Sequence, residues 1–321
     1  MLKARFRHFL GAAGQVAPGS PFHRLSLFSY KLLGIWIAAL AAAFWLAGFS
    51  FGSSPVYPMI GLSIWVLMSA LLARRYGLNR VALMLEALSL PAVVGTVTVV
   101  TTIVLAKYSV PLTDQLLHQI DGWFGFHWLA LFDVYDRNPG MMGALNYAYD
   151  TFNPQIFLVP LVLVLARDEV TLWTFITAWI VASLATGLLF PFFPAGGPYL
   201  HFGIGPERVP ELERTWHWEF GPLIERLQSG QLTDLSQAIM GIVSLPSFHA
   251  AAAVMYVLAL RRVRWVWPVC LAVNAVLLFS IPVNGAHYLS DVIAGIALGL
   301  VSYWFATRLI GRADQATAVS A

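Results

Sequence analysis

Charged residues are scarce in this sequence of 321 residues. Asp, Glu, Lys and Arg make up 11% of the chain, whereas soluble domains carry roughly 25%. Hydrophobic residues make up 59%, and the mean hydropathy is +0.72. This composition excludes an ordinary soluble domain and predicts a polytopic membrane protein. The 12 tryptophans fit that class, because Trp is enriched where helices meet the membrane interface.

Cysteine is almost absent as well. The single Cys270 excludes an intrachain disulfide and any cysteine-based zinc site, and its apolar surroundings indicate a small core residue. The sequence also lacks basic clusters. Its 19 Lys and Arg residues are scattered over short loops, so we expect no nucleic-acid partner. No repeat of fixed period is present, which favours a single domain.

A sustained apolar run is missing from the N-terminus, where Gly and Pro interrupt residues 1–30 before Leu32. An ordinary cleavable signal peptide is therefore not expected. We predict a cytoplasmic tail over 1–30, one transmembrane domain over 31–310 and a cytoplasmic tail over 311–321. The fold class is all-α, a polytopic helical bundle of about eight spans. They are 31–51, 57–73, 81–106, 140–166, 170–192, 246–260, 263–282 and 286–308.

Lys and Arg divide unevenly between the two sides that these spans define. With the N-terminus inside, fourteen lie in inner loops and five in the outer segments. The two stretches that do not span, 107–139 and 193–244, both fall outside. Because cytoplasmic loops carry the excess of Lys and Arg, both termini are predicted to be cytoplasmic. The predicted location is a bacterial inner membrane, with the outer segments facing the periplasm.

Two short segments concentrate the ionisable residues at the outer edge of the spans. They are Ser244–His249 and Asn284–Asp291. Ionisable groups at membrane depth are costly and mark functional sites. His287 and Asp291 are spaced i, i+4, so a helix places them on one face. A carboxylate that orients one histidine, with His249 as a second, is the pattern of a nucleophilic-histidine enzyme.

These segments resemble the second and third signature motifs of the type 2 phosphatidic acid phosphatase superfamily. The second motif of that family is Pro-Ser-Gly-His, and here Pro246-Ser247-Phe248-His249 stands in its place. In the third motif Ser280, His287 and Asp291 keep the family spacing. Phe248 and the wording around His287 resemble the branch that includes inositol phosphorylceramide synthases. The segment from Asp121 to Phe126 and that from Tyr147 to Gln155 add to this similarity, which covers about residues 115–305, the expected catalytic core.

The resemblance implies an enzyme that transfers phosphoryl groups of lipids through a phosphohistidine. His287 would attack phosphorus, Asp291 would orient its ring, and His249 would protonate the departing oxygen. The partner would be a phosphorylated membrane lipid or a polyprenyl phosphate, and the acceptor either water or an alcohol. A phosphatase and a phosphotransferase remain open alternatives. No metal or other cofactor is required, because His287 itself supplies the nucleophile. The lipid and the oligomeric state are left open.

One position departs from the family pattern. The third motif normally carries an arginine that offsets phosphate charge, and Ile281 occupies its place. The family's first motif, with its Lys and Arg, is not found either. Backbone N–H groups of Gly196 and Gly197 and the hydroxyl of Tyr199 are candidate substitutes. The alternative is a flexible turn without a binding role. The outer-loop residues Arg208, Arg214 and Arg226 are weaker candidates.

Polar residues also open the fourth predicted span. Tyr147, Asp150 and Gln155 are candidate contacts to a polar head group, because polar side chains at membrane depth face a wet cavity or another helix. Hydrogen bonding between helices is the alternative interpretation. Ser247 and Tyr288, inside the two motifs, are further candidate substrate contacts.

Two other interpretations concern the remaining histidines and a protein without catalytic activity. His118, His127, His201 and His217 have no metal-ligand spacing, so we interpret them as solvated or interfacial. A transporter or lipid-binding protein without chemistry would favour corresponding broken helices in two half-repeats. The sequence shows no such symmetry.

Overall fold

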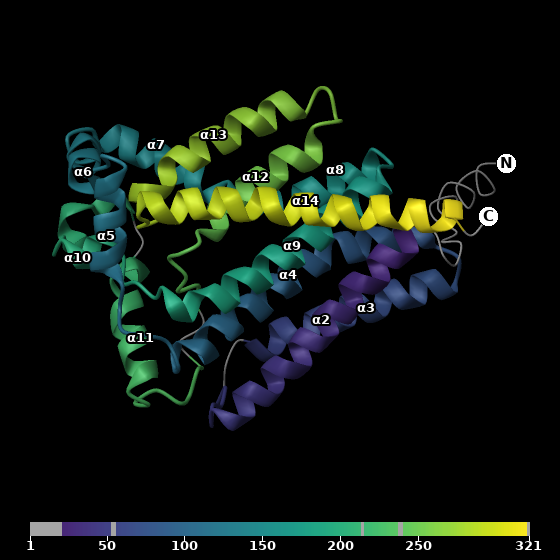
Figure 1. Cartoon of the computed structure of the whole chain (residues 1–321), viewed down its shortest axis with the longest axis horizontal. Helices are drawn as coiled ribbons and strands as arrows, with labels where there is room; N and C mark the ends of the chain where they lie inside the picture. The colour runs from purple at the N-terminus through teal and green to yellow at the C-terminus, as the bar shows by residue number, and fades with distance from the viewer. Residues whose placement is uncertain (1–20, 53–55, 213–214, 237–239, 320–321) are drawn as a thin grey trace.

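The computed structural model describes residues 21–52, 56–212, 215–236 and 240–319. Within these ranges the chain forms helices and turns, with only an isolated bridge between Ser50 and Asp234. The predicted all-α membrane bundle is confirmed. The elements that build it are α2 (Pro21–Leu46), α3 (Val56–Arg75), α4 (Asn79–Ala106), α7 (Pro139–Asp150), α8 (Phe152–Leu165), α9 (Glu169–Leu189), α12 (Phe248–Leu260), α13 (Trp267–Asn284) and α14 (Leu289–Val319) (Figure 1).

Each of the eight predicted spans has a helical counterpart. Six segments of the described chain are long and apolar enough to cross a membrane, with Pro139–Leu165 counted as one. The helix α12 is apolar but only 13 residues long, and α3 has 20 residues. The number of spans and their direction stay predictions. The helix α2 begins at Pro21 and α14 continues through Val319, so helical structure extends into both predicted tails, whose assignment stays a prediction. Residues 1–20 of the predicted N-terminal tail lie outside the described residues.

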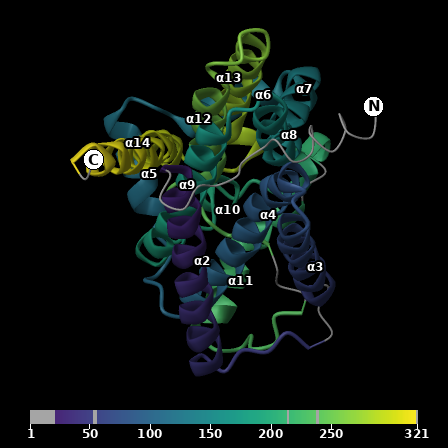
Figure 2. The same cartoon turned by 90° about the vertical axis from the view of Figure 1, so that its right-hand side faces the viewer.

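The centre of the bundle is α9, which packs against α2, α4, α12 and α14. Its side chains Trp173, Phe175 and Trp179 are fully buried, and the last two rings lie 6.0 and 5.8 Å from the ring of Tyr256 on α12. Because lipid tails are as apolar as these rings, close packing rather than exclusion from water holds such helices together. The helix α3 packs chiefly on α4, so it lies at the edge of the bundle (Figure 2).

Two glycines bring α12 and α14 into close contact. A Cβ on Gly295 would lie 2.2 Å from the backbone oxygen of Ser247, and one on Gly299 would lie 2.5 Å from that of Ala251. The two glycines are separated by three residues. Small residues at this spacing let membrane helices approach closely. The two motif segments begin these same two helices. Their approach therefore depends on the absence of side chains at positions 295 and 299.

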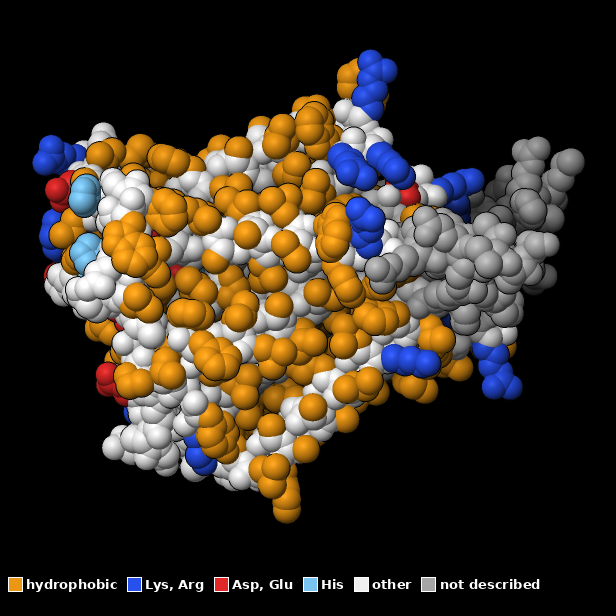
Figure 3. Space-filling model, viewed as in Figure 1, with side chains coloured by type: hydrophobic (Ala, Val, Ile, Leu, Met, Phe, Trp, Pro, Cys, Tyr) orange, Lys and Arg blue, Asp and Glu red, His pale blue; other side chains and the backbone are white. Residues whose placement is uncertain are grey.

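The segments predicted not to span gather at one end of the molecule, called the loop end here. It contains α5 (Asp114–Trp123), α6 (Trp128–Asp136), α10 (Pro198–His201) and α11 (Phe220–Gln228) (Figure 1). Between this end and the opposite one, a broad band of exposed hydrophobic side chains crosses the molecule (Figure 3). Large members of the exposed set include Trp65, Val269 and Trp304. Such a band is expected where lipid tails surround the protein.

Candidate active site

A carboxylate contacts a ring nitrogen of His287. The Nδ1 atom of His287 lies 3.1 Å from Oδ2 of Asp291, one helical turn further along the chain. The same carboxylate oxygen accepts hydrogen bonds from the hydroxyl of Ser244 at 2.6 Å and from the backbone N–H of Tyr288 at 3.0 Å. Both residues of the pair are buried. The carboxylate is thus held in one orientation by three neighbours.

This contact determines which nitrogen of His287 carries a proton when Asp291 is ionised. An ionised carboxylate can only accept hydrogen bonds, so Nδ1 must be the nitrogen that carries the proton toward Asp291. The lone pair then lies on Nε2. The hydroxyl of Ser247 lies 3.4 Å from Nε2. Nε2 therefore faces the motif at the start of α12.

The second histidine has aromatic neighbours. The Nδ1 atom of His249 lies 3.3 Å from the hydroxyl of Tyr149, and the two rings stack with centroids 4.5 Å apart. The ring of Phe152 lies 4.1 Å away on a tilt. A Cβ on Gly285 would lie 2.6 Å from the Tyr149 ring and 3.0 Å from that of His287. Gly285 therefore lets Tyr149 reach both histidine segments.

The fold joins the two motifs directly. The backbone N–H of Ser247 donates to the backbone oxygen of Asp291 at 3.0 Å. A family model described as the PAP2 superfamily matches residues 115–305. The chain belongs to the PAP2 superfamily. The matched range coincides with the extent of similarity expected from the motifs. No curated protein and no solved structure matches the chain.

Members of the PAP2 superfamily are generally phosphatases or phosphotransferases, and this membrane-helical chain is consistent with an enzyme acting on lipids. Its departure from the family motif has a structural counterpart. Ile281, at the arginine position, is fully buried and packs in an apolar cluster with Ala250, Leu277 and Val292. In this PAP2 protein the position serves packing between α12, α13 and α14.

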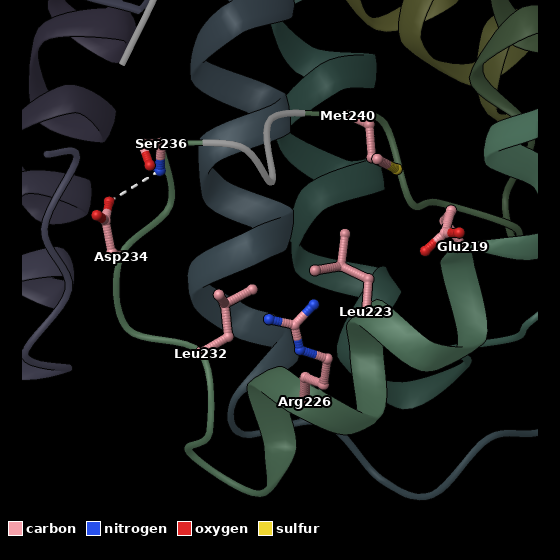
Figure 4. A pocket seen from close by; sticks show the side chains of 7 residues that line it. All are labelled: Glu219, Leu223, Arg226, Leu232, Asp234, Ser236 and Met240. Carbon is pink, nitrogen blue, oxygen red and sulfur yellow. Dashed lines mark hydrogen bonds between the residues drawn. The ribbon is translucent and has the colours of Figure 1, made fainter. Parts of the chain in front are cut away.

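The basic residues of the loop end have other contacts. Lys107 donates to the backbone oxygen of Ala47 at 2.6 Å, and Arg208 pairs with Asp136 at 2.9 Å. Arg226 lies in a separate hollow of about 390 Å³ that neither histidine lines (Figure 4). Arg214 lies outside the described residues. The lining of the hollow is Glu219, Leu223, Arg226, Leu232, Asp234, Ser236 and Met240.

The turn over residues 193–199 binds a carboxylate of the protein itself. The N–H groups of Gly196 and Gly197 donate to the carboxylate of Asp114 at 2.9 and 2.8 Å. Tyr199 is fully buried, and its hydroxyl donates to the backbone oxygen of Val283 at 3.0 Å. Burial raises the pKa of Tyr199 above its ordinary value. In this structure the groups predicted to meet a phosphate thus hold neighbouring segments of the chain.

The polar side chains of the fourth predicted span point to different sides of the helix. Tyr147 is 78% exposed and Asp150 is exposed, whereas Tyr149 reaches His249. Residues two apart on a helix face away from each other. The structure therefore brings Tyr149, rather than Tyr147, to the site. Gln155 accepts a hydrogen bond from Asn274 of α13 at 2.6 Å, which is the interhelical alternative.

Sequence reasoning missed Tyr149, Ser244 and Asp114. Tyr288 is buried, and its hydroxyl donates to Asp114 at 2.9 Å. The pattern offered one signal, since Asp114 and Asp121 are seven residues apart and a helix places them on one face. Burial raises the pKa of Asp121, while two backbone N–H donors act in the opposite direction.

The remaining histidines lie at the loop end. His118 and His201 have ring centroids 5.4 Å apart, and burial lowers the pKa of His201. His217 is buried and stacks on Tyr199, so the expectation of a solvated histidine is wrong there. Across the described residues, no three His, Cys, Asp or Glu side chains gather as a metal site requires.

Proposed function

We propose that this protein is an integral-membrane phosphatase or phosphotransferase that acts on a lipid-linked phosphate through a phosphohistidine on His287. The observation that supports it is the pair of His287 and Asp291, with Nδ1 and Oδ2 3.1 Å apart. That contact leaves the lone pair of Nε2 for attack. His249, from the adjoining helix, supplies the second titratable group.

The chemistry runs in two steps. In the first, Nε2 of His287 forms a bond to phosphorus, the bond from phosphorus to the leaving oxygen breaks, and His249 gives that oxygen a proton. Asp291 stabilises the positive charge that develops on the ring. In the second, His249 takes the proton of the acceptor hydroxyl, whose oxygen attacks phosphorus as the P–N bond breaks. Both histidines return to their starting states.

The first turn of α12 is the proposed site for the phosphate oxygens. Helix N-termini carry unpaired N–H groups and a positive partial charge. Ser247 stands at the cap position of α12, but it makes no side-chain hydrogen bond to the helix and its hydroxyl lies near His287 instead. The corresponding N–H groups of α14 are taken by carboxylates. Phosphate oxygens are therefore bound by α12 rather than by an arginine at position 281.

The acceptor decides between the two activities. Water gives a phosphatase, and an alcohol gives a head-group transferase similar to inositol phosphorylceramide synthases. Ile281 and Phe248 favour the transferase branch. The active site is assigned to the non-cytoplasmic face, periplasmic in a bacterium, because only five of the 19 Lys and Arg residues belong to the segments of the sequence that are predicted to be outside.

Purified protein in detergent with EDTA tests the proposal. A panel of lipid phosphates labelled on phosphorus, offered with and without inositol, should yield label on a histidine in the wild-type protein and none in His287→Ala. Full turnover by His287→Ala, or strict dependence on an added divalent metal, would contradict the mechanism. Lipid binding with neither label nor product would favour a carrier that performs no chemistry.

A further inference from the structure

Helix α5 carries two carboxylates that the two-step reaction does not use. Asp114 and Asp121 lie two turns apart, so they share one face of the helix. That face meets the start of α14, the segment that carries His287 and Asp291.

Asp121 caps α14 from another helix. It is fully buried, and its two oxygens accept the backbone N–H groups of Leu289 and Ser290, each at 2.8 Å. Asp291 accepts the N–H of Tyr288. The first N–H groups of a helix have no partner within it. With these three bonds, the first turn of α14 has a defined position, and so has the carboxylate that holds His287.

Asp114 joins three segments at one point. It accepts the N–H groups of Gly196 and Gly197 and the hydroxyl of Tyr288, the residue after the nucleophile. Gly197 has φ of +94°, and a Cβ there would lie 3.0 Å from the backbone oxygen of Ala286. The glycine turn therefore rests on the residue before the nucleophile. Asp114 holds it there.

Ala286 shows why such support is needed. Its φ is +55°, in the left-handed region that residues other than glycine adopt at a cost. Such a conformation persists where the surrounding structure determines it, and these positions cluster at active sites. Here it directly precedes His287. The bonds from α5 act on both sides of this strained residue, through Gly197 and through Tyr288.

We propose that Asp114 and Asp121 are positioning residues, which hold segment 286–290 in the strained conformation that aims Nε2 of His287 at phosphorus. This inference rests on the proposed function, since it assumes His287 as nucleophile. Loss of either carboxylate lets the segment relax. The chemical step then slows while the binding of lipid is preserved.

Kinetics of Asp114→Asn and Asp121→Asn, on the lipid phosphate that the wild-type protein turns over, test this. We expect kcat to fall about tenfold or more, as for other residues that orient a reactive group, with KM within about twofold of the wild-type value because α12 binds the phosphate. Asp133→Asn, an exposed carboxylate on neighbouring α6, is the matched control and should leave kcat unchanged. Hydrogen exchange of amides 286–291 should quicken only in the α5 variants.

A rescue separates positioning from general stability. Glycine adopts the left-handed conformation without cost, so Ala286→Gly combined with Asp114→Asn should recover a large part of the lost kcat. A structural role in folding alone would not produce that recovery. Where an Asn variant fails to fold, Tyr288→Phe removes only one bond to Asp114 and should still lower kcat.

Three results would overturn the inference. The first is a wild-type kcat in all three of Asp114→Asn, Asp121→Asn and Tyr288→Phe. The second is a loss of kcat in the control Asp133→Asn that equals the loss in the α5 variants. The third is no recovery of kcat when Ala286→Gly is added to Asp114→Asn. Failure of the proposed function looks different, because His287→Ala would then remain active. The hydrogen exchange measurement needs no substrate, so the hold of α5 on segment 286–291 is tested in either case.

Discussion

The two histidines of the site have different neighbours. His287 is 5% exposed and is held by the carboxylate of Asp291, which in turn has Ser244 and the backbone of Tyr288 as donors. His249 is half-buried between two aromatic rings, with the hydroxyl of Tyr149 on its Nδ1. The contacts of the first imidazole include a carboxylate, and those of the second include a phenol hydroxyl and two aromatic rings.

That difference suits each ring to its proposed role. A carboxylate fixes the tautomer and favours a ring that becomes positive, as a nucleophile does when it binds phosphorus. His249 has the hydroxyl of Tyr149 on its Nδ1 and is the group that exchanges a proton with the substrate in the proposed reaction. It can give the proton up and take it back within one cycle, as a general acid and base must. The predictions below test this division of roles.

The largest effect is expected from removing each histidine in turn. His287→Ala should abolish turnover and leave no phosphohistidine. His249→Ala should lose about 10²- to 10⁴-fold in turnover, yet still form phosphohistidine from an aryl phosphate, whose leaving group needs little protonation. Rapid-quench measurement of protein-bound phosphate distinguishes the two. Equal loss of phosphohistidine in both variants would remove the division of roles.

Asp291→Asn should come next. An amide cannot hold the same tautomer, because its NH₂ group donates where the carboxylate accepts, and comparable replacements cost about 10⁴-fold in rate. Ser244→Ala removes one donor to that carboxylate and should cost far less. The two variants are compared by their turnover. Their thermal unfolding midpoints are measured as well, to show that both are equally well folded. Similar losses in the two would show that Asp291 acts through packing.

Gly295→Ala tests the close contact between α12 and α14, the helices that begin with the two motif segments. The added Cβ would lie 2.2 Å from the backbone oxygen of Ser247, so α12 and α14 must separate. A displacement of about 1 Å can cost on the order of 10²-fold in rate, and overpacking typically costs about 1–3 kcal/mol in stability. Gly95→Ala on α4 has nothing within 4 Å of its Cβ and is the control. Turnover and thermal midpoints check both variants.

Tyr149→Phe should give the smallest effect. It removes the hydroxyl from Nδ1 of His249 and keeps the ring stack. One such hydrogen bond contributes about 1 kcal/mol, which corresponds to roughly fivefold in rate. Tyr147→Phe, on the opposite side of the helix, is the matched control and should have wild-type turnover. A larger loss in Tyr147→Phe than in Tyr149→Phe would restore the original assignment to Tyr147.

Helix positions followed from composition because apolar runs of about 20 residues have few other structures available in a membrane. The pairing of His287 with Asp291 followed from spacing alone, since i and i+4 share a helix face. Helix boundaries were less accurate. The end of α14 at Val319, beyond the predicted tail boundary, is an example, because hydropathy marks the apolar part of a helix and not its full length.

The sequence by itself determined the fold class, the membrane environment and the motif residues, because these depend on composition and on spacing along one helix. Only the tertiary structure decided which polar residues serve the site. Tyr149 and Tyr147 point to different sides of their helix. The hydropathy of an evenly apolar helix does not show which side faces the site. Asp114 meets Gly197 and Tyr288 across long separations in the chain. Such contacts depend on how the helices pack, and the pattern along the chain does not contain that information.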